Sequence, residues 1–188
     1  MRHIHILIHL SLDGFLADAR GSLDHFPAGD ENLDYVYRLT EKADTALFGR
    51  RSWELLEAWW PGAAKLPGAS AAQIGYSRWY NEAQKIVATN SRLGEHQPGT
   101  QFISGDLGAA LNAVKQQPGA DILLFGSASV ARQLMAAGVV DHYRIFINPV
   151  LFGSGIPLFS DELPLAKLKL CESHSFPNGE IALHYVPA

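Results

Sequence analysis

The sequence has very little cysteine and no long hydrophobic run. Cys171 is the only cysteine among 188 residues, so neither an intrachain disulfide nor a cysteine-based zinc site can form. We interpret Cys171 as a small core residue, because nothing near it in the sequence would activate a thiol. No apolar segment is long enough to cross a bilayer, and histidines interrupt the apolar run of residues 1–10, which does not resemble a signal peptide. We therefore expect a cytoplasmic protein without a membrane partner.

Basic residues are also scarce. Lysine and arginine number 15 against 19 acidic residues, which gives a formal net charge of -4. A nucleic-acid binder needs a basic face to neutralise phosphates, so a nucleic-acid partner is not expected and a small-molecule substrate is. The length and the 47% hydrophobic content suit one well-buried domain, residues 1–188, and are too small for two.

The N-terminal part of the sequence predicts a strand, a loop and a helix. Residues 3–10 alternate, with isoleucines and a leucine on one face and three histidines on the other. We favour a structural role for these histidines over a metal site, and expect only His9, nearest the carboxyl end, to face a ligand. The glycine- and aspartate-rich residues 11–24 predict a loop that can close over a site. Residues 30–42 have the pattern of an amphipathic helix.

One stretch organises the rest of the chain. The apolar residues 122–125 lack polar alternation, which indicates a strand buried on both faces. Gly126 allows a sharp turn, and Ser127 or Ser129 can cap the helix that follows and ends near Gly138. The first N–H groups of such a helix, with its dipole, suit a phosphate. Taken alone, this pattern is more typical of an ordinary strand–helix turn than of a phosphate site.

The same pattern occurs twice more. Residues 45–48 predict a strand that ends at Gly49 and a helix that opens with two arginines. Cations at a helix start oppose its dipole, so either an anionic ligand or pairing with Glu54 and Glu57 accounts for them. Residues 85–89 predict a further strand that ends in small polar residues and an arginine.

Three such turns predict a dinucleotide site, because ligands of open α/β sheets bind beyond the carboxyl ends of the strands. The paired N–H donors of arginine guanidinium groups suit a 2′-phosphate, which favours NADPH over NADH. The turn at Gly126 would hold the pyrophosphate. No G-x-G-x-x-G follows the first strand, so this is not the usual dinucleotide fingerprint. The cofactor-binding residues predicted in this way are Gly49, Arg50, Arg51, Ser52, Thr89, Asn90, Ser91, Arg92, Gly126, Ser127, Ala128 and Ser129.

The C-terminal part changes from strand–helix alternation to strands alone. Residues 140–151 are strand-like, and residues 168–176 and 180–186 predict a hairpin joined by a Pro-Asn-Gly turn. Such antiparallel strands leave an edge that must be paired or protected, and a two-fold partner is one way to do so. We expect a homodimer.

Four segments resemble a known family. They are residues 11–14 (SLDG), 46–54 (ALFGRRSWE), 125–128 (FGSA) and 146–159 (FINPVLFGSGIPLF), and the last is the most specific. In this order, over nearly the whole chain, they resemble the bacterial dihydrofolate-reductase-like proteins. These share the C-terminal reductase domain of the bifunctional riboflavin-biosynthesis deaminase/reductase.

The resemblance implies an α/β fold with a mostly parallel central sheet, antiparallel C-terminal strands and flanking helices. It also implies NADPH bound across the strand ends and, commonly, a homodimer. By the same resemblance, Asp13 belongs to the loop beside nicotinamide and substrate. Riboflavin-pathway reductases have a lysine directly after the SLDG motif, where this chain has Phe15, whose apolar ring cannot bind a ribose phosphate. The resemblance is therefore closer for the cofactor than for the substrate.

The leading hypothesis is an NADPH-dependent reductase that transfers hydride to a C=N or C=O carbon of a small heterocyclic or carbonyl substrate, such as a pteridine or a ribosylaminopyrimidine. A proton must also reach the neighbouring heteroatom, and Asp13, Asp34 or a bound water is the expected donor. Asp24 and Asp30 are weaker candidates, and for each aspartate a local turn or capping role is the competing interpretation.

Two other hypotheses stay open. A sensor or partner module would bind NADP(H) without turnover. A structural dimer with a relic pocket would not bind it at all, and such a protein has no reason to collect arginines at helix starts.

Overall fold

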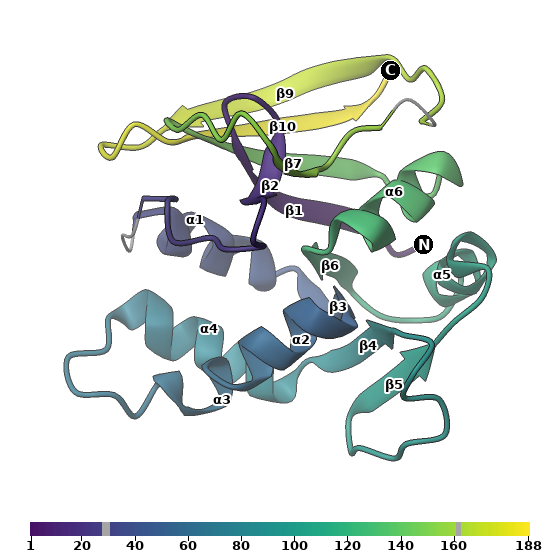
Figure 1. Cartoon of the computed structure of the whole chain (residues 1–188). Coiled ribbons are helices and arrows are strands. Elements are labelled where there is room, and N and C mark those ends of the chain that lie inside the picture. Colours follow the sequence, from purple (N-terminus) through teal and green to yellow (C-terminus); the bar gives the residue numbers. More distant parts are fainter. Residues whose placement is uncertain (28–30, 161–162) are drawn as a thin grey trace.

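The computed structural model describes residues 1–27, 31–160 and 163–188, and within them one eight-stranded sheet organises the chain (Figure 1). The strand order is β5-β4-β3-β6-β1-β7-β10-β9. The strands from β5 to β7 are parallel, and β10 runs antiparallel to β7 and β9. The predicted fold class, a mostly parallel sheet with antiparallel C-terminal strands, is confirmed. The sheet consists of β1 (Ile4–Ser11), β3 (Ala43–Gly49), β4 (Gln84–Ala88), β5 (Thr100–Ile103), β6 (Asp121–Phe125), β7 (His142–Asn148), β9 (Leu168–Ser175) and β10 (Ile181–Pro187).

Helices cover both faces of this sheet. One face packs against α5 (Leu107–Lys115) and α6 (Ala128–Ala136), and the other packs against α1 (Glu31–Thr40), α2 (Arg50–Glu57) and α4 (Ala71–Glu82). A short helix, α3 (Trp60–Ala63), connects α2 to the segment before α4 (Figure 1). None of the helices in the described ranges is both long and apolar enough to span a membrane.

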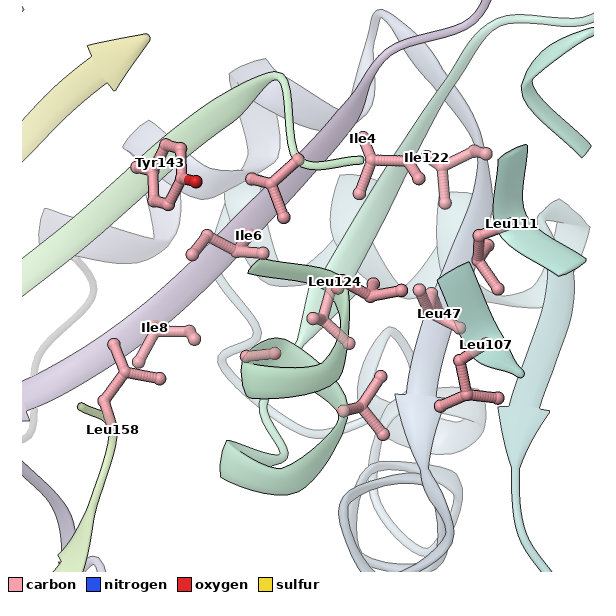
Figure 2. Packing of buried hydrophobic residues seen from close by; sticks show 14 of the residues in the cluster. Ile4, Ile6, Ile8, Leu47, Leu107, Leu111, Ile122, Leu124, Tyr143 and Leu158 are labelled. Atoms are coloured by element: carbon pink, nitrogen blue, oxygen red, sulfur yellow. The ribbon is translucent and has the colours of Figure 1, made fainter. Parts of the chain in front are cut away.

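The alternation of β1 separates the two halves of the core. Ile4, Ile6 and Ile8 point toward α5 and α6 and pack with residues of β6 and β3, as Figure 2 shows. The opposite side of β1 carries the histidines and faces α1. Burial of the three isoleucines stabilises the sheet by roughly 1.5–3 kcal/mol for each side chain. This face pattern decides which β1 side chains can reach a ligand.

Local signals explain several element boundaries. The Asp106 carboxylate accepts a hydrogen bond from the backbone N–H of Ala109 at 2.9 Å and so caps the start of α5. The Ser70 hydroxyl and the Gln73 side chain form a reciprocal capping box at the start of α4. The predicted C-terminal hairpin is also confirmed, with Gly179 at a φ of 88° in its turn.

Two expectations about the fold were wrong. The segment predicted as a loop after β1 contains a short strand, β2 (Phe15–Asp18), which pairs with β8 (Gly155–Pro157) in a separate two-stranded sheet. Cys171 is exposed on β9 rather than part of the core, because no element covers that end of the sheet in the described part of the chain.

Candidate functional site

The carboxyl ends of β1, β3, β4 and β6 meet at one edge of the sheet and surround a cavity of about 1030 Å³. Parallel neighbouring strands bring their ends to the same edge, so the three predicted turns converge there. The volume lies at the upper end of the range for ligand sites and suits a dinucleotide together with a small substrate. Of the predicted cofactor residues, the structure brings these to the cavity wall: Gly49, Arg50, Arg51, Ser52, Thr89, Asn90, Ser91, Gly126, Ser127, Ala128 and Ser129.

The turn after β3 lies directly against the turn after β6. A Cβ atom added at Gly49 would be 2.6 Å from both Cβ and Oγ of Ser127. Gly126 has a φ of 57°, and a Cβ atom there would be 3.1 Å from the Ser52 hydroxyl. The peptide bond between Gly126 and Ser127 is cis. The absence of side chains at both glycines therefore keeps the two backbones close and leaves space beside them for a ligand.

The start of α6 supplies free backbone donors. Ser127 is at the N-cap position, but its hydroxyl makes no capping bond and instead lies 2.9 Å from the Ser129 hydroxyl, so the predicted side-chain cap was wrong. Within the ranges described, the backbone N–H groups of Ala128, Ser129 and Val130 have no acceptor. These N–H groups at the positive end of the helix dipole suit an anion.

The two arginines that open α2 have different surroundings. The Arg50 guanidinium donates to both carboxylate oxygens of Glu54 at 3.0 Å, the helical pairing that competed with an anionic ligand as an explanation. Arg51 is exposed and makes no ion pair with any described residue. Exposed pairs are weak, so Arg50 can exchange Glu54 for a phosphate, and Arg51 is available without such an exchange.

Arg92 does not line the cavity, although Thr89, Asn90 and Ser91 do. Its guanidinium is 2.7 Å from the Glu95 carboxylate and lies over the Trp53 ring at 4.8 Å from the ring centre. Side-chain packing on Trp53 and pairing with Glu95 turn this arginine away from the strand end.

Neither predicted catalytic carboxylate lines the cavity. The Asp13 carboxylate accepts hydrogen bonds from the Ser11 hydroxyl at 2.6 Å and from the backbone N–H groups of Phe152 and Gly153 at 3.1 and 2.7 Å. These bonds, chiefly the one from Ser11, hold the pKa of Asp13 below its usual value. Asp13 therefore ties the loop after β1 to residues 152–153. Asp34 is exposed on α1, away from the cavity, and Asp30 lies outside the described residues.

A histidine in the cavity wall pairs with a buried glutamate behind it, and the sequence did not predict this pair. His9 lines the cavity, and its Nδ1 lies 2.9 Å from Oε1 of the fully buried Glu180. The other oxygen of Glu180 accepts a hydrogen bond from the Asn32 side chain at 3.0 Å. The position of His9 was anticipated from strand direction, but 171 positions separate it from Glu180, and no local signal relates the two.

The remaining histidines of β1 lie at the other end of the strand. The His5 ring stacks on His142 at 4.1 Å between centres, and His142 Nδ1 is 2.9 Å from His184 Nε2. Burial, together with the nearby His142 charge, lowers the pKa of His5 to about 4. No group of three or more histidine, cysteine, aspartate or glutamate side chains in the described ranges is arranged to hold a metal ion.

Comparison with known proteins places the chain in a family. The family model of the RibD C-terminal domain matches residues 2–182. A relative in Bacillus subtilis (strain 168), the uncharacterized protein YyaP, is 27% identical over 184 residues, which cover 98% of this chain and 94% of YyaP.

Solved structures share the fold. A diaminohydroxyphosphoribosylaminopyrimidine deaminase/5-amino-6-(5-phosphoribosylamino)uracil reductase from Thermotoga maritima superposes with a TM-score of 0.68 at 18% identity, over 100% of this chain and 57% of that one. The dihydrofolate reductase from Enterococcus faecalis, complexed with NADP(H), superposes with a TM-score of 0.63 at 12% identity, over 98% of this chain and 96% of that one.

Proposed function

Because the chain belongs to the RibD C-terminal domain family, we propose that it is an NADPH-dependent reductase that transfers hydride to a small heterocyclic or carbonyl substrate. One observation carries the proposal: three polar turns at neighbouring strand ends line a single cavity, and two of them touch through Gly49 and Ser127. The E. faecalis dihydrofolate reductase, which has the same fold, holds NADP(H). The donor set of this chain fits such a cofactor.

Each turn has a role in the proposal. The free N–H groups at the start of α6, with Ser127 and Ser129, would hold the pyrophosphate. Arg50 and Arg51 would bind the 2′-phosphate, and Thr89 to Ser91 would contact the adenine end. When bound, NADPH would supply the hydride, and the protein would orient the substrate and supply the proton.

The substrate is proposed to be related to those of aminouracil and dihydrofolate reductases, without a ribose phosphate. Phe15 occupies the position of the lysine found in riboflavin-pathway reductases, and it pairs through β2 with Pro157. The three polar turns all lie in the part of the cavity assigned to the cofactor.

A second candidate is an NADP(H)-binding sensor or partner module without turnover. Its support is that Asp13 and Asp34 both lie outside the cavity lining, which leaves the expected carboxylate donor without a place there. Both candidates predict NADPH binding, and they differ in whether NADPH is consumed.

The test is a spectrophotometric screen of NADPH oxidation with pteridines, ribosylaminopyrimidines and aromatic carbonyl compounds. Loss of nicotinamide absorbance that depends on both protein and substrate supports the reductase. Tight NADPH binding with no oxidation by any compound would favour the sensor.

We also propose that the protein forms a homodimer through the open end of the sheet. All eight residues of β9 are exposed, and Leu168, Leu170 and Ile181 present apolar side chains there. An unpaired apolar edge favours association with a second copy. Sedimentation of the wild-type protein as a monomer at micromolar concentration would refute this.

A further inference from the structure

A buried carboxylate lies behind the cavity wall. No part of the Glu180 side chain is exposed, and its Oε2 accepts a hydrogen bond from Asn32. Its Oε1 has no aligned hydrogen-bond partner among the described residues, although Nδ1 of His9 is only 2.9 Å away. An unsatisfied buried carboxylate oxygen is costly, so Glu180 favours the state of His9 that carries an N–H group on Nδ1.

His9 is held in one orientation. Its ring stacks on Phe146, with centres 4.6 Å apart and planes inclined by 11°. The side chain is 35% exposed and lines the cavity. With Nδ1 beside Glu180, Nε2 is the nitrogen available to a ligand in the cavity that His9 lines. A histidine oriented by a carboxylate in this way is suited to proton transfer.

Among the described residues, the aromatic rings in contact with His9 are neutral. The elements packed against it contribute Phe146 from β7, Asn32 from α1 and Phe26 from the segment after β2. That segment also carries Arg20 and His25, which lie near Asp18 rather than His9. Glu180 is the one charged side chain paired with His9 within the described ranges.

Much of the cavity wall outside the three polar turns is apolar and includes Leu16, Leu23, Phe26, Leu33, Val36 and Trp60. Arg20 and Arg132 also line the cavity, and their guanidinium groups are engaged by the Asp18 carboxylate and the Pro157 carbonyl. Such apolar side chains stabilise a flat ring by burying its faces. His9 and Asn32 are polar groups at its edge, where a ring heteroatom can accept a hydrogen bond.

We propose that His9 donates the proton in the reduction, that Glu180 and Asn32 are positioning residues for it, and that the substrate is a flat, uncharged ring with a reducible C=N or C=O bond. This inference rests on the proposed reductase function and names its proton donor and substrate class. His9 would act as the catalytic residue in place of the carboxylates Asp13 and Asp34.

The carbon of the C=N or C=O bond gains a hydride supplied by the cofactor, which is oxidised, and the π bond breaks toward the heteroatom. His9 Nε2 gives its proton to that heteroatom, so the product carries C–H together with N–H or O–H. The imidazole regains a proton from solvent, and the Glu180 side chain beside Nδ1 stabilises its protonated form.

The experiment compares wild type with His9→Gln and Glu180→Gln. His96→Gln is the matched control, since His96 is exposed on a loop outside the cavity. Each protein is titrated calorimetrically with NADPH and then assayed across pH with dihydropterin, dihydrobiopterin, dihydrofolate and the phosphorylated ribosylaminopyrimidine. Glutamine keeps a hydrogen-bonding side chain at position 9 but cannot transfer a proton.

We expect turnover of the uncharged pterins, and a fall in kcat of about 10²–10⁴ in His9→Gln with unchanged NADPH affinity. The pH dependence of kcat should flatten in this variant, and Glu180→Gln should shift it with a smaller loss of kcat. A kcat in His9→Gln within about twofold of wild type overturns the role of His9. The proposed substrate class is overturned if the protein binds NADPH but reduces only the phosphorylated compound. It is also overturned if the protein binds NADPH and reduces none of the four compounds. Absence of NADPH binding in wild type would instead refute the proposed function.

Discussion

Replacement of Gly49 by alanine tests whether contact between two turns builds the cofactor site. The new Cβ atom would lie 2.6 Å from both Cβ and Oγ of Ser127, about 1 Å inside ordinary van der Waals contact. Overpacking of this kind costs about 1–3 kcal/mol, and each kcal/mol lowers the melting temperature by roughly 2–4 °C in a chain of this size. The turn after β6 must move away, and this displaces the N–H groups proposed to hold the pyrophosphate.

NADPH affinity should therefore fall by at least about tenfold, the effect of a loss of 1.4 kcal/mol. The assay is a calorimetric titration of each protein with NADPH beside a thermal melt. Gly62→Ala is the matched control, because nothing lies within 4 Å of the added Cβ atom and the φ angle is ordinary. Gly49→Ala with the stability and NADPH affinity of wild type would refute the reasoning.

Three further predictions follow from the site and the fold. Arg51→Ala should weaken NADPH binding by about 10–100-fold while leaving NADH nearly unchanged, and Arg78→Ala, an exposed arginine outside the cavity, should alter neither affinity. Asp13→Asn should lower the melting temperature but reduce kcat only a few-fold, because Asp13 joins two loops. A fall in kcat of about 100-fold would instead support Asp13 as the proton donor. The free energy of unfolding should fall by up to about 3 kcal/mol as the pH falls from 6.5 to about 4, because buried His5 takes up its proton more readily when unfolded. Chemical denaturation across this range should show a smaller fall in His5→Gln, and an equal fall would contradict this assignment.

The convergence of the three polar turns on one cavity could be predicted from the sequence because the signals for these turns are local. Each turn follows its own strand within a few residues, and parallel strands bring such ends together whatever their order. Arg92 was the exception, since packing on Trp53 and pairing with Glu95 decide its direction. The direction of the Asp34 side chain depends on the exact residue at which α1 begins. An error of one residue in that start rotates the side chain by about 100° around the helix axis.

The substrate half depends on contacts between distant segments. Glu180 reaches His9 only because β10 lies beside β7 and β7 beside β1, an order that periodicity does not encode. The pairing of β2 with β8 was equally difficult to predict from the sequence, because both strands are short and follow glycine-rich turns. Cys171 was misassigned because its exposure depends on whether another element covers β9.

The central claim is that the cavity at the strand ends holds NADPH. Its most direct test is a calorimetric titration of the wild-type protein with NADPH and, separately, with NADH. We predict saturable binding of one NADPH per chain, tighter than that of NADH. No heat from either nucleotide, at protein concentrations where millimolar binding would be visible, would contradict the claim.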